Sequence, residues 1–216
     1  MNSCCRPEAY GAFFSAKGAR RALRRYRRRG LDRLSTQIAA VVRERGVRGA
    51  TVLEVGGGIG ALEVELLEAG AERATNVELS PEYEDAAAEL ARERGVERQV
   101  ERRVGDFVAE PDVPDADTVV MNRVVCCYPD YEALVGTAAD RARRLLVFTF
   151  PREGPLVRSV FSLMNLWLRL RGSDFRGFVH PGRAMLEVAE RRGMTPVVQR
   201  RGLFWQLAAL ERTSQP

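Results

Sequence analysis

The sequence of 216 residues is poor in the side chains that bind metals or cross-link secreted proteins. It contains one histidine and four cysteines, which form two adjacent pairs, Cys4-Cys5 and Cys126-Cys127. Adjacent pairs match neither a disulfide framework nor a CxxC zinc site, so we expect reduced thiols and no metal centre. No apolar run reaches the roughly 18 residues that cross a bilayer, and the N-terminus lacks a signal-peptide core. We therefore expect a cytoplasmic protein.

Lysine is also scarce, since Lys17 is the only lysine among 34 basic residues. The net charge of +5 is uneven, because residues 1–33 carry a large basic excess and the remainder is slightly acidic. This basic segment is a solvated helix face, a patch for an anionic substrate or acidic membrane surface, or a nucleic-acid site. Nucleic acid is the least favoured partner, because aromatic and basic residues are not interleaved beyond Tyr26.

The stretch that organises the chain begins at Thr51. A short run rich in β-branched residues, 51–55, precedes Gly56-Gly57-Gly58-Ile59-Gly60, and apolar residues then recur with helical spacing over 59–67. This order predicts a strand, a tight turn and a helix, which open a βαβ unit. Glycines at such a turn allow positive φ angles and let a ligand approach the helix N-terminus. The sequence therefore predicts a nucleotide-like ligand.

Glu54 favours one kind of nucleotide. The run Gly56-x-Gly58-x-x-Ala61 formally matches the fingerprint for dinucleotides. A carboxylate two residues before the first glycine would repel a diphosphate but attract the ammonium and sulfonium groups of S-adenosylmethionine. Glu78 ends the next predicted strand, where it can accept hydrogen bonds from ribose hydroxyls in either kind of site.

Three motifs in this order, Glu54–Gly60, Glu78-Leu79 and Gly105-Asp106-Phe107, resemble those of class I S-adenosylmethionine-dependent methyltransferases. The resemblance spans roughly residues 50–150. It implies an α/β fold with a Rossmann-like seven-stranded sheet and helices on both faces. It also implies that Glu54, Gly56 and Gly58 surround the methionine moiety, Glu78 binds the ribose, Leu79 packs on adenine and Asp106 accepts from the adenine amino group. The complete predicted cofactor site is Glu54, Gly56, Gly57, Gly58, Gly60, Glu78, Leu79, Asp106, Phe107 and Asn122.

Two regions are predicted outside the core of this fold. Residues 1–48 form an N-terminal helical cap with helices at 16–29 and 31–45, and residues 49–216 form the methyltransferase domain. Tyr10, Phe13 and Tyr26 are candidates either to close over the ligand or to dock the cap.

Residues 155–180 are predicted as a helical insertion after the fifth strand. The helix over 156–170 is apolar around nearly all its girth and needs cover on more than one side. We favour a lid over a large apolar substrate, with a homodimer interface or peripheral membrane contact as alternatives. Near the C-terminus, two strands joined by Arg201-Gly202-Leu203 must pair antiparallel.

Catalytic candidates follow the fourth strand and the insertion. The strand over 117–122 delivers Asn122 and the segment 126–130 to the edge where open parallel sheets bind ligands. There Tyr128 and Asp130 are candidates for substrate contact or proton removal. His180 is either a general base or a structural residue before the next helix. The cysteines of this segment are interpreted as pocket walls, with a soft-metal role as the alternative.

We predict a methyltransferase that uses S-adenosylmethionine to methylate an oxygen of a small, amphipathic or anionic molecule. The general layout is similar to that of magnesium-protoporphyrin O-methyltransferases. Alternatives are an RNA methyltransferase, an NAD-dependent oxidoreductase and a cofactor-binding protein without catalysis. After the fourth strand the chain reads Asn122-Arg123-Val124-Val125, not the Asn-Pro-Pro-Tyr type of motif that methylates amino groups.

Overall fold

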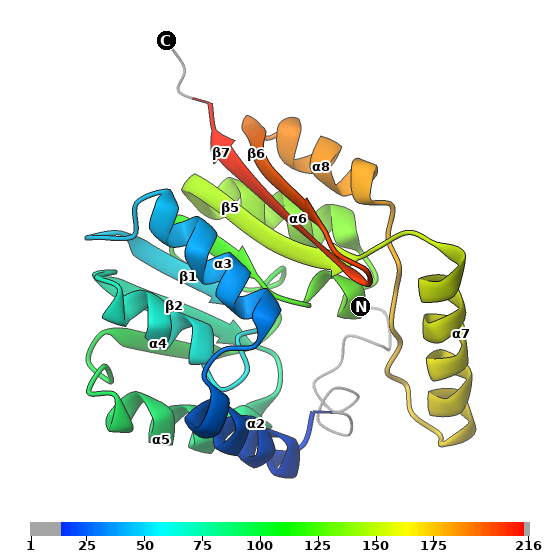
Figure 1. Cartoon of the computed structure of the whole chain (residues 1–216), viewed down its shortest axis with the longest axis horizontal. Coiled ribbons are helices and arrows are strands. Elements are labelled where there is room, and N and C mark those ends of the chain that lie inside the picture. Colours follow the sequence, from blue (N-terminus) through cyan, green and yellow to red (C-terminus); the bar gives the residue numbers. More distant parts are fainter. Residues whose placement is uncertain (1–13, 214–216) are drawn as a thin grey trace.

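The computed structural model describes residues 14–213 and contains one seven-stranded sheet of order β3-β2-β1-β4-β5-β7-β6 (Figure 1). All neighbouring strands are parallel except at β7, which runs antiparallel to both β5 and β6. The predicted sheet and its terminal antiparallel pair are therefore confirmed. The strands are β1 (Thr51–Val55), β2 (Arg73–Glu78), β3 (Val100–Val104), β4 (Ala116–Met121), β5 (Ala142–Pro151), β6 (Met194–Arg201) and β7 (Trp205–Arg212).

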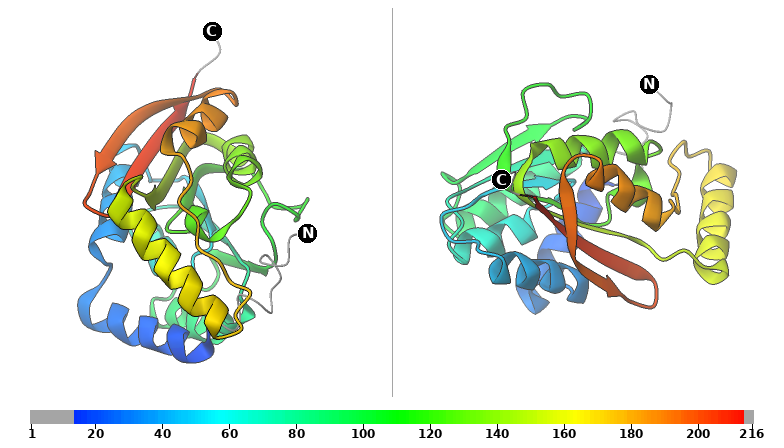
Figure 2. Two further views of the ribbon diagram at one scale, coloured as in Figure 1. Left: turned by 90° about the vertical axis from the view of Figure 1, so that its right-hand side faces the viewer. Right: turned by 90° about the horizontal axis from the view of Figure 1, so that it is seen from above.

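Helices cover both faces of the sheet, as predicted (Figures 1 and 2). The helices α2, α3, α4 and α5 lie on one face, and α6 and α8 lie on the other. Alternate strand residues point into the two layers, so that Val120 and Val147 face the first and Val119 and Leu146 face the second. The helices are α2 (Ala16–Arg29), α3 (Arg33–Glu44), α4 (Ala61–Glu68), α5 (Glu84–Glu93), α6 (Tyr131–Arg141), α7 (Pro155–Leu170) and α8 (Gly182–Glu190).

The two N-terminal helices share one apolar core with the sheet. Leu23 of α2 and Ile38 of α3 are buried in the same cluster as Leu66 of α4. Tyr26 is buried as well, and its hydroxyl donates to a carboxylate oxygen of Glu65 at 2.9 Å. This contact favours docking as the role of Tyr26. Tyr10 and Phe13 lie outside the described residues.

Helix α5 is preceded by a turn after the end of β2. A 3-10 turn at Pro81–Tyr83 precedes α5, and the Ser80 side chain makes no capping bond. Its hydroxyl instead donates to the Phe14 carbonyl at 3.1 Å. The serine therefore ties the segment before α2 to the end of β2.

Helix α7 stands beyond the carboxyl ends of the strands and projects from the rest of the molecule (Figure 1). It packs on the segment 173–180, where the Asn165 amide exchanges two hydrogen bonds of 2.8 Å with the Gly177 backbone. Only Val157, Phe161 and Leu168 of this helix are buried. Among residues 14–213, no helix is long and apolar enough to span a bilayer.

Candidate active site

Two cavities flank the glycine loop, residues 56–60, at the carboxyl end of β1. The first has a volume of about 180 Å³ and a mainly apolar wall that also carries Glu78 and Asp106. The second measures about 230 Å³, is more polar and lies between the loop and helices α2 and α3. Gly56, Gly58, Asn122 and other residues line both. The structure thus places a two-part site at the sheet edge where open parallel sheets bind ligands.

The first two glycines of the loop leave no room for a side chain. Gly56 has φ 65°, and a Cβ there would lie 2.7 Å from Val124. A Cβ on Gly57 would lie 2.1 Å from the Asn76 amide nitrogen. Gly58 is held on both sides, since its N–H donates to Glu78 at 2.8 Å and its carbonyl accepts from Arg102 at 2.9 Å. The loop is therefore fixed by packing and by hydrogen bonds.

A cluster of carboxyl groups is buried beneath the loop. Glu54 and Glu63 are only 3% and 2% exposed, and a Glu54 oxygen accepts from the Glu63 backbone N–H at 3.0 Å. Burial raises the pKa of Glu63 to about 7, although the nearby Arg102 charge lowers it. Burial also raises the pKa of Glu54, and the adjacent Glu63 raises it further. Arg102, which pairs with Glu63 and with Glu84, was not a sequence-based candidate.

The surroundings of Glu54 weaken the prediction that its negative charge rejects diphosphates. Glu54 lines the second cavity, but its carboxyl group faces the first turn of α4 and has a raised pKa. A carboxyl group that resists ionisation is a poor means of rejecting diphosphates. The choice of cofactor therefore needs support other than the charge of Glu54.

The predicted nucleoside contacts come together in the first cavity. Glu78 is buried, and its second oxygen accepts from the Ser80 N–H at 3.0 Å. Burial raises the pKa of Glu78, while hydrogen bonds from Ser80 and Gly58 lower it. Leu79 and Phe107 line the same cavity. Asp106 lines it as well.

Tyr128 and Asp106 are in direct contact in this cavity. The tyrosine hydroxyl donates to the Asp106 carboxylate at 3.1 Å, and the Val108 N–H donates to the same group at 3.1 Å. Of the three catalytic candidates, Tyr128 is the one that lines the cavity. Its hydroxyl lies beside the residue that is predicted to bind adenine.

The structure does not bring Asp130 and His180 to the cavity wall. Asp130 is exposed and accepts from the Ala133 N–H at 2.9 Å, which caps α6. His180 is buried, and its Nε2 lies 2.8 Å from the Tyr128 carbonyl. Because a carbonyl only accepts, Nε2 must carry the proton. Burial lowers the pKa of His180, and this geometry gives it a structural role.

Arg123, which the sequence places at this edge of the sheet without a role, lines both cavities. Its φ of 62° is the only positive value at a non-glycine residue among the described residues. The guanidinium pairs with both Asp32 oxygens at 2.8 and 3.0 Å, and its backbone N–H donates to Thr149 at 2.8 Å. Burial alone would raise the pKa of Asp32, but the bonds and charge of Arg123 lower it. Such strain at a non-glycine residue is typical of functional sites.

Two predicted cofactor residues remain, Gly60 and Asn122, and Asn122 joins α3 to the sheet. Its side-chain nitrogen donates to the Ser35 hydroxyl at 2.9 Å, and its oxygen accepts from Thr149 at 3.0 Å. Gly60, with φ 74°, precedes the first turn of α4. Asn122 lines both cavities, whereas Gly60 lines neither.

The cysteine pair that the structure describes forms part of the cavity wall. The sulfurs of Cys126 and Cys127 are 3.7 Å apart, and Cys127 lines the first cavity. A hydrogen bond with Cys126 and burial raise the pKa of Cys127, which keeps it a neutral thiol. Within residues 14–213 no group of three or more histidine, cysteine or acidic residues is arranged to hold a metal ion. Cys4 and Cys5 lie outside the described residues.

A family model described as a methyltransferase domain matches residues 20–199. The chain belongs to this methyltransferase family. Membership confirms the predicted enzyme class, an S-adenosylmethionine-dependent methyltransferase, and does not favour the oxidoreductase or the protein without catalysis. No curated protein matches the chain significantly.

Solved structures with the same fold belong to several methyltransferases. Magnesium protoporphyrin IX methyltransferase from Synechocystis, with bound S-adenosylhomocysteine, has 18% identity over 83% of this chain and 82% of that one, with a TM-score of 0.68. An O-methyltransferase family protein from Burkholderia thailandensis has 21% identity over 94% of this chain and 64% of that one, with a TM-score of 0.71. Geranyl diphosphate C-methyltransferase from Streptomyces coelicolor has 16% identity over 82% of this chain and 78% of that one, with a TM-score of 0.65. At these identities the likeness shows the fold of the methyltransferase and leaves its acceptor open.

Proposed function

We propose that this methyltransferase transfers the methyl group of S-adenosylmethionine to an oxygen of a small, anionic and amphipathic molecule. The observation that carries the proposal is the Arg123 guanidinium, which follows β4 directly and borders both cavities. Its side chain is 37% exposed. It can therefore exchange one of its Asp32 contacts for an acidic group of the acceptor.

The residues around the glycine loop fit the cofactor. Glu78 would accept from the ribose hydroxyls, and Leu79 and Asp106 would hold the adenine. The polar second cavity, with Asn122 and the loop backbone, would hold the methionine moiety. The fit is supported by the glycines, because a Cβ on Gly58 would lie 3.3 Å from the Tyr83 ring and narrow this space.

The lining favours an acceptor that does not need a base. Among the described lining residues, the Glu78 and Asp106 carboxylates already accept hydrogen bonds, and the Cys127 thiol has a raised pKa. A carboxylate or an acidic hydroxyl is already ionised near neutral pH. The bound cofactor supplies an activated methyl group, so that the protein has mainly to align the acceptor oxygen and exclude water.

An apolar wall supports the amphipathic character of the acceptor. Cys127 and Phe14 line the first cavity. They pack with Leu168 of α7 and with Phe175 in the segment after it. An acceptor with an acidic group at Arg123 and an apolar body along this wall would satisfy both surfaces.

The test uses radiolabelled S-adenosylmethionine and a fractionated cell extract. We expect label to enter an acidic, lipid-soluble fraction, and mild alkali to release it as methanol if the acceptor is a carboxylate. Arg123→Gln should lower this transfer by about tenfold or more, the effect of losing a charged hydrogen bond. Arg183→Gln, at an exposed position on α8, should leave transfer unchanged. Label in RNA would overturn the proposal and favour the RNA alternative.

A further inference from the structure

One face of α7 is exposed although it is apolar. Its members recur every three or four residues, so that they share one side of the helix. Leu163, in the middle, is 66% exposed. The buried residues Val157, Phe161 and Leu168 lie on a different side, against the body of the protein. The α7 face comprises Leu156, Val160, Leu163, Leu166, Trp167 and Leu170.

The tip of the β6–β7 hairpin is a second element with an exposed apolar side chain beside α7. Leu203 at the tip is 85% exposed, the largest value among the exposed large hydrophobic residues of the described chain. The next residue, Phe204, stacks on Phe161 of α7 with ring centroids 6.1 Å apart. The hairpin tip therefore lies against α7, and two elements contribute exposed apolar side chains to the same end of the molecule.

The charges around this surface are predominantly basic. Helix α7 contains no acidic residue and carries Arg158 and Arg169, and Arg171 follows it. The Arg171 guanidinium lies over the Trp167 ring at 4.4 Å. Two acidic residues flank the helix, Glu153, which is 3.9 Å from Arg158, and Asp174.

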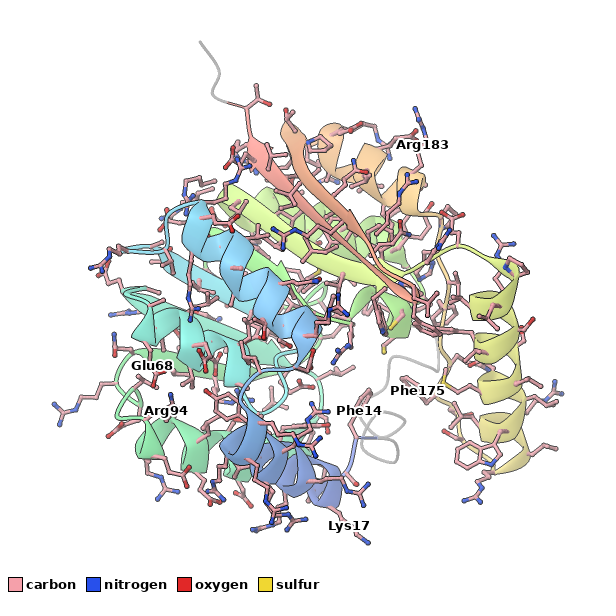
Figure 3. All side chains as sticks on the ribbon, in the orientation of Figure 1. Phe14, Lys17, Glu68, Arg94, Phe175 and Arg183 are labelled. Carbon is pink, nitrogen blue, oxygen red and sulfur yellow. The ribbon has the colours of Figure 1, made fainter. Side chains whose placement is uncertain are left out.

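Helix α2 adds a second basic surface at this end of the molecule. It also lacks acidic residues, and its arginines at 20, 21, 24, 28 and 29 are exposed together with Lys17. Figure 3 shows Phe14 and Phe175 in the space between α2 and α7, and their rings meet edge to face at 5.6 Å. In the left view of Figure 2, α7 lies in front and α2 runs along the bottom of the molecule.

We propose that the α7 face docks this protein on an anionic lipid bilayer. A helix with an exposed apolar side, arginines beside it and a tryptophan within it suits the boundary between lipid headgroups and acyl chains. With 16 residues, α7 is about 24 Å long and lies in the plane of the membrane. The exposed arginines of α2 supply longer-range attraction to the negative surface.

Charge complementarity favours a bilayer over a second copy of the chain. In a two-fold dimer through α7 with antiparallel helices, the basic rim of one copy would meet the basic rim of the other. An anionic surface neutralises these same arginines. The inference goes beyond the proposed function, since it concerns where the enzyme binds and holds whatever molecule is methylated.

The test is sedimentation of the full chain with vesicles of phosphatidylcholine, with or without phosphatidylglycerol. We expect binding to the mixed vesicles only, weakening as salt is raised from 0.1 to 0.5 M. Leu163→Glu should reduce the partition coefficient by about tenfold or more, because it removes an inserted leucine and adds a repelled charge. Ser162→Glu adds the same charge at an exposed position outside the α7 face and should reduce it by about threefold or less.

Three outcomes would overturn the proposal: no binding to mixed vesicles at low salt, equal effects of the two variants, or a concentration-dependent dimer that Leu163→Glu abolishes. The last would assign the face to a second copy. Calorimetry of S-adenosylmethionine binding on the same preparations keeps the two proposals apart. If the protein does not bind vesicles but still binds S-adenosylmethionine, only the membrane proposal is overturned.

Discussion

The glycine loop and helix α7 lie at the same end of the sheet but differ in almost every physical respect. Beneath the loop, Glu54 and Glu63 are almost completely buried and hydrogen-bonded, and the two polar groups of the Gly58 backbone have fixed partners. On α7, more large apolar side chains face outward than inward. The comparison separates a tightly packed part, which is predicted to bind the cofactor, from a part with an exposed apolar surface. Substitutions should therefore act strongly in the first and weakly in the second.

The largest effect is expected from Gly57→Ala. The new Cβ would lie 2.1 Å from the Asn76 amide nitrogen and 2.8 Å from the Glu54 carboxyl carbon, both buried. We expect the free energy of unfolding to fall by about 3 kcal/mol, with loss of cofactor binding. Urea denaturation measures the free energy of unfolding, and calorimetry measures cofactor binding. Gly154→Ala, just before α7, meets no atom within 4 Å and should cost less than about 1 kcal/mol. Equal losses would remove the contrast between the two regions.

Glu78→Ala should weaken S-adenosylmethionine binding by about 1.5 to 3 kcal/mol, because it removes a charged acceptor from the ribose. Calorimetry with the purified protein measures this change. Glu101→Ala, on the neighbouring strand β3, removes an exposed carboxylate that pairs with Arg103 and should leave the affinity unchanged. Wild-type affinity in the Glu78 variant would contradict the assignment of the first cavity.

Stability should fall as the pH rises, because burial raises the pKa of Glu63 to about 7. A carboxyl group whose pKa is raised by folding favours the native state below its ordinary pKa of 4.5, and that advantage is lost as the pH passes through 7. We expect the free energy of unfolding to decrease by about 1 to 3 kcal/mol between pH 5 and 8. Glu63→Gln should make this profile less steep, and the pKa of Glu54, which burial also raises, accounts for the slope that remains. Glu68→Gln, on the exposed side of α4, should leave the profile as it is, and an unchanged profile in the Glu63 variant would assign the titration elsewhere.

The smallest effect on transfer is expected at His180. Glutamine offers an N–H donor for the Tyr128 carbonyl but no basic nitrogen, so His180→Gln should keep the rate of label transfer within about threefold. His180→Ala loses the bond and should lower the free energy of unfolding by about 1 to 2 kcal/mol. A general base would instead show a rate loss of about 100-fold in both variants. That result would restore the catalytic interpretation.

The sequence predicts the parts of this protein that depend on local order. The glycine run, the periodic apolar residues and the final antiparallel pair identify the sheet, since each signal lies within a few neighbouring residues. Asp130 also carried a local signal, because an aspartate immediately before a helix is a favoured N-cap.

Contacts between distant segments could not be predicted in this way. Arg123 pairs with Asp32, 91 residues earlier, and takes an unusual φ that no local pattern indicates. Arg102 reaches Glu63 across 39 residues. For His180, the chemistry of imidazole suggested a base, but its burial beside Phe178 and Tyr131 depends on tertiary packing.

Both polar groups of the Gly58 backbone have fixed hydrogen-bond partners, so the amide of this residue can report whether the cofactor is bound. Its hydrogen is bonded to Glu78, the same carboxylate that the ribose is predicted to engage. A seated ribose must share or displace that acceptor, so the rate of deuterium uptake at Gly58 should change on binding. Such a readout would need no methyl acceptor, so ligands of the cofactor site could be ranked by it directly.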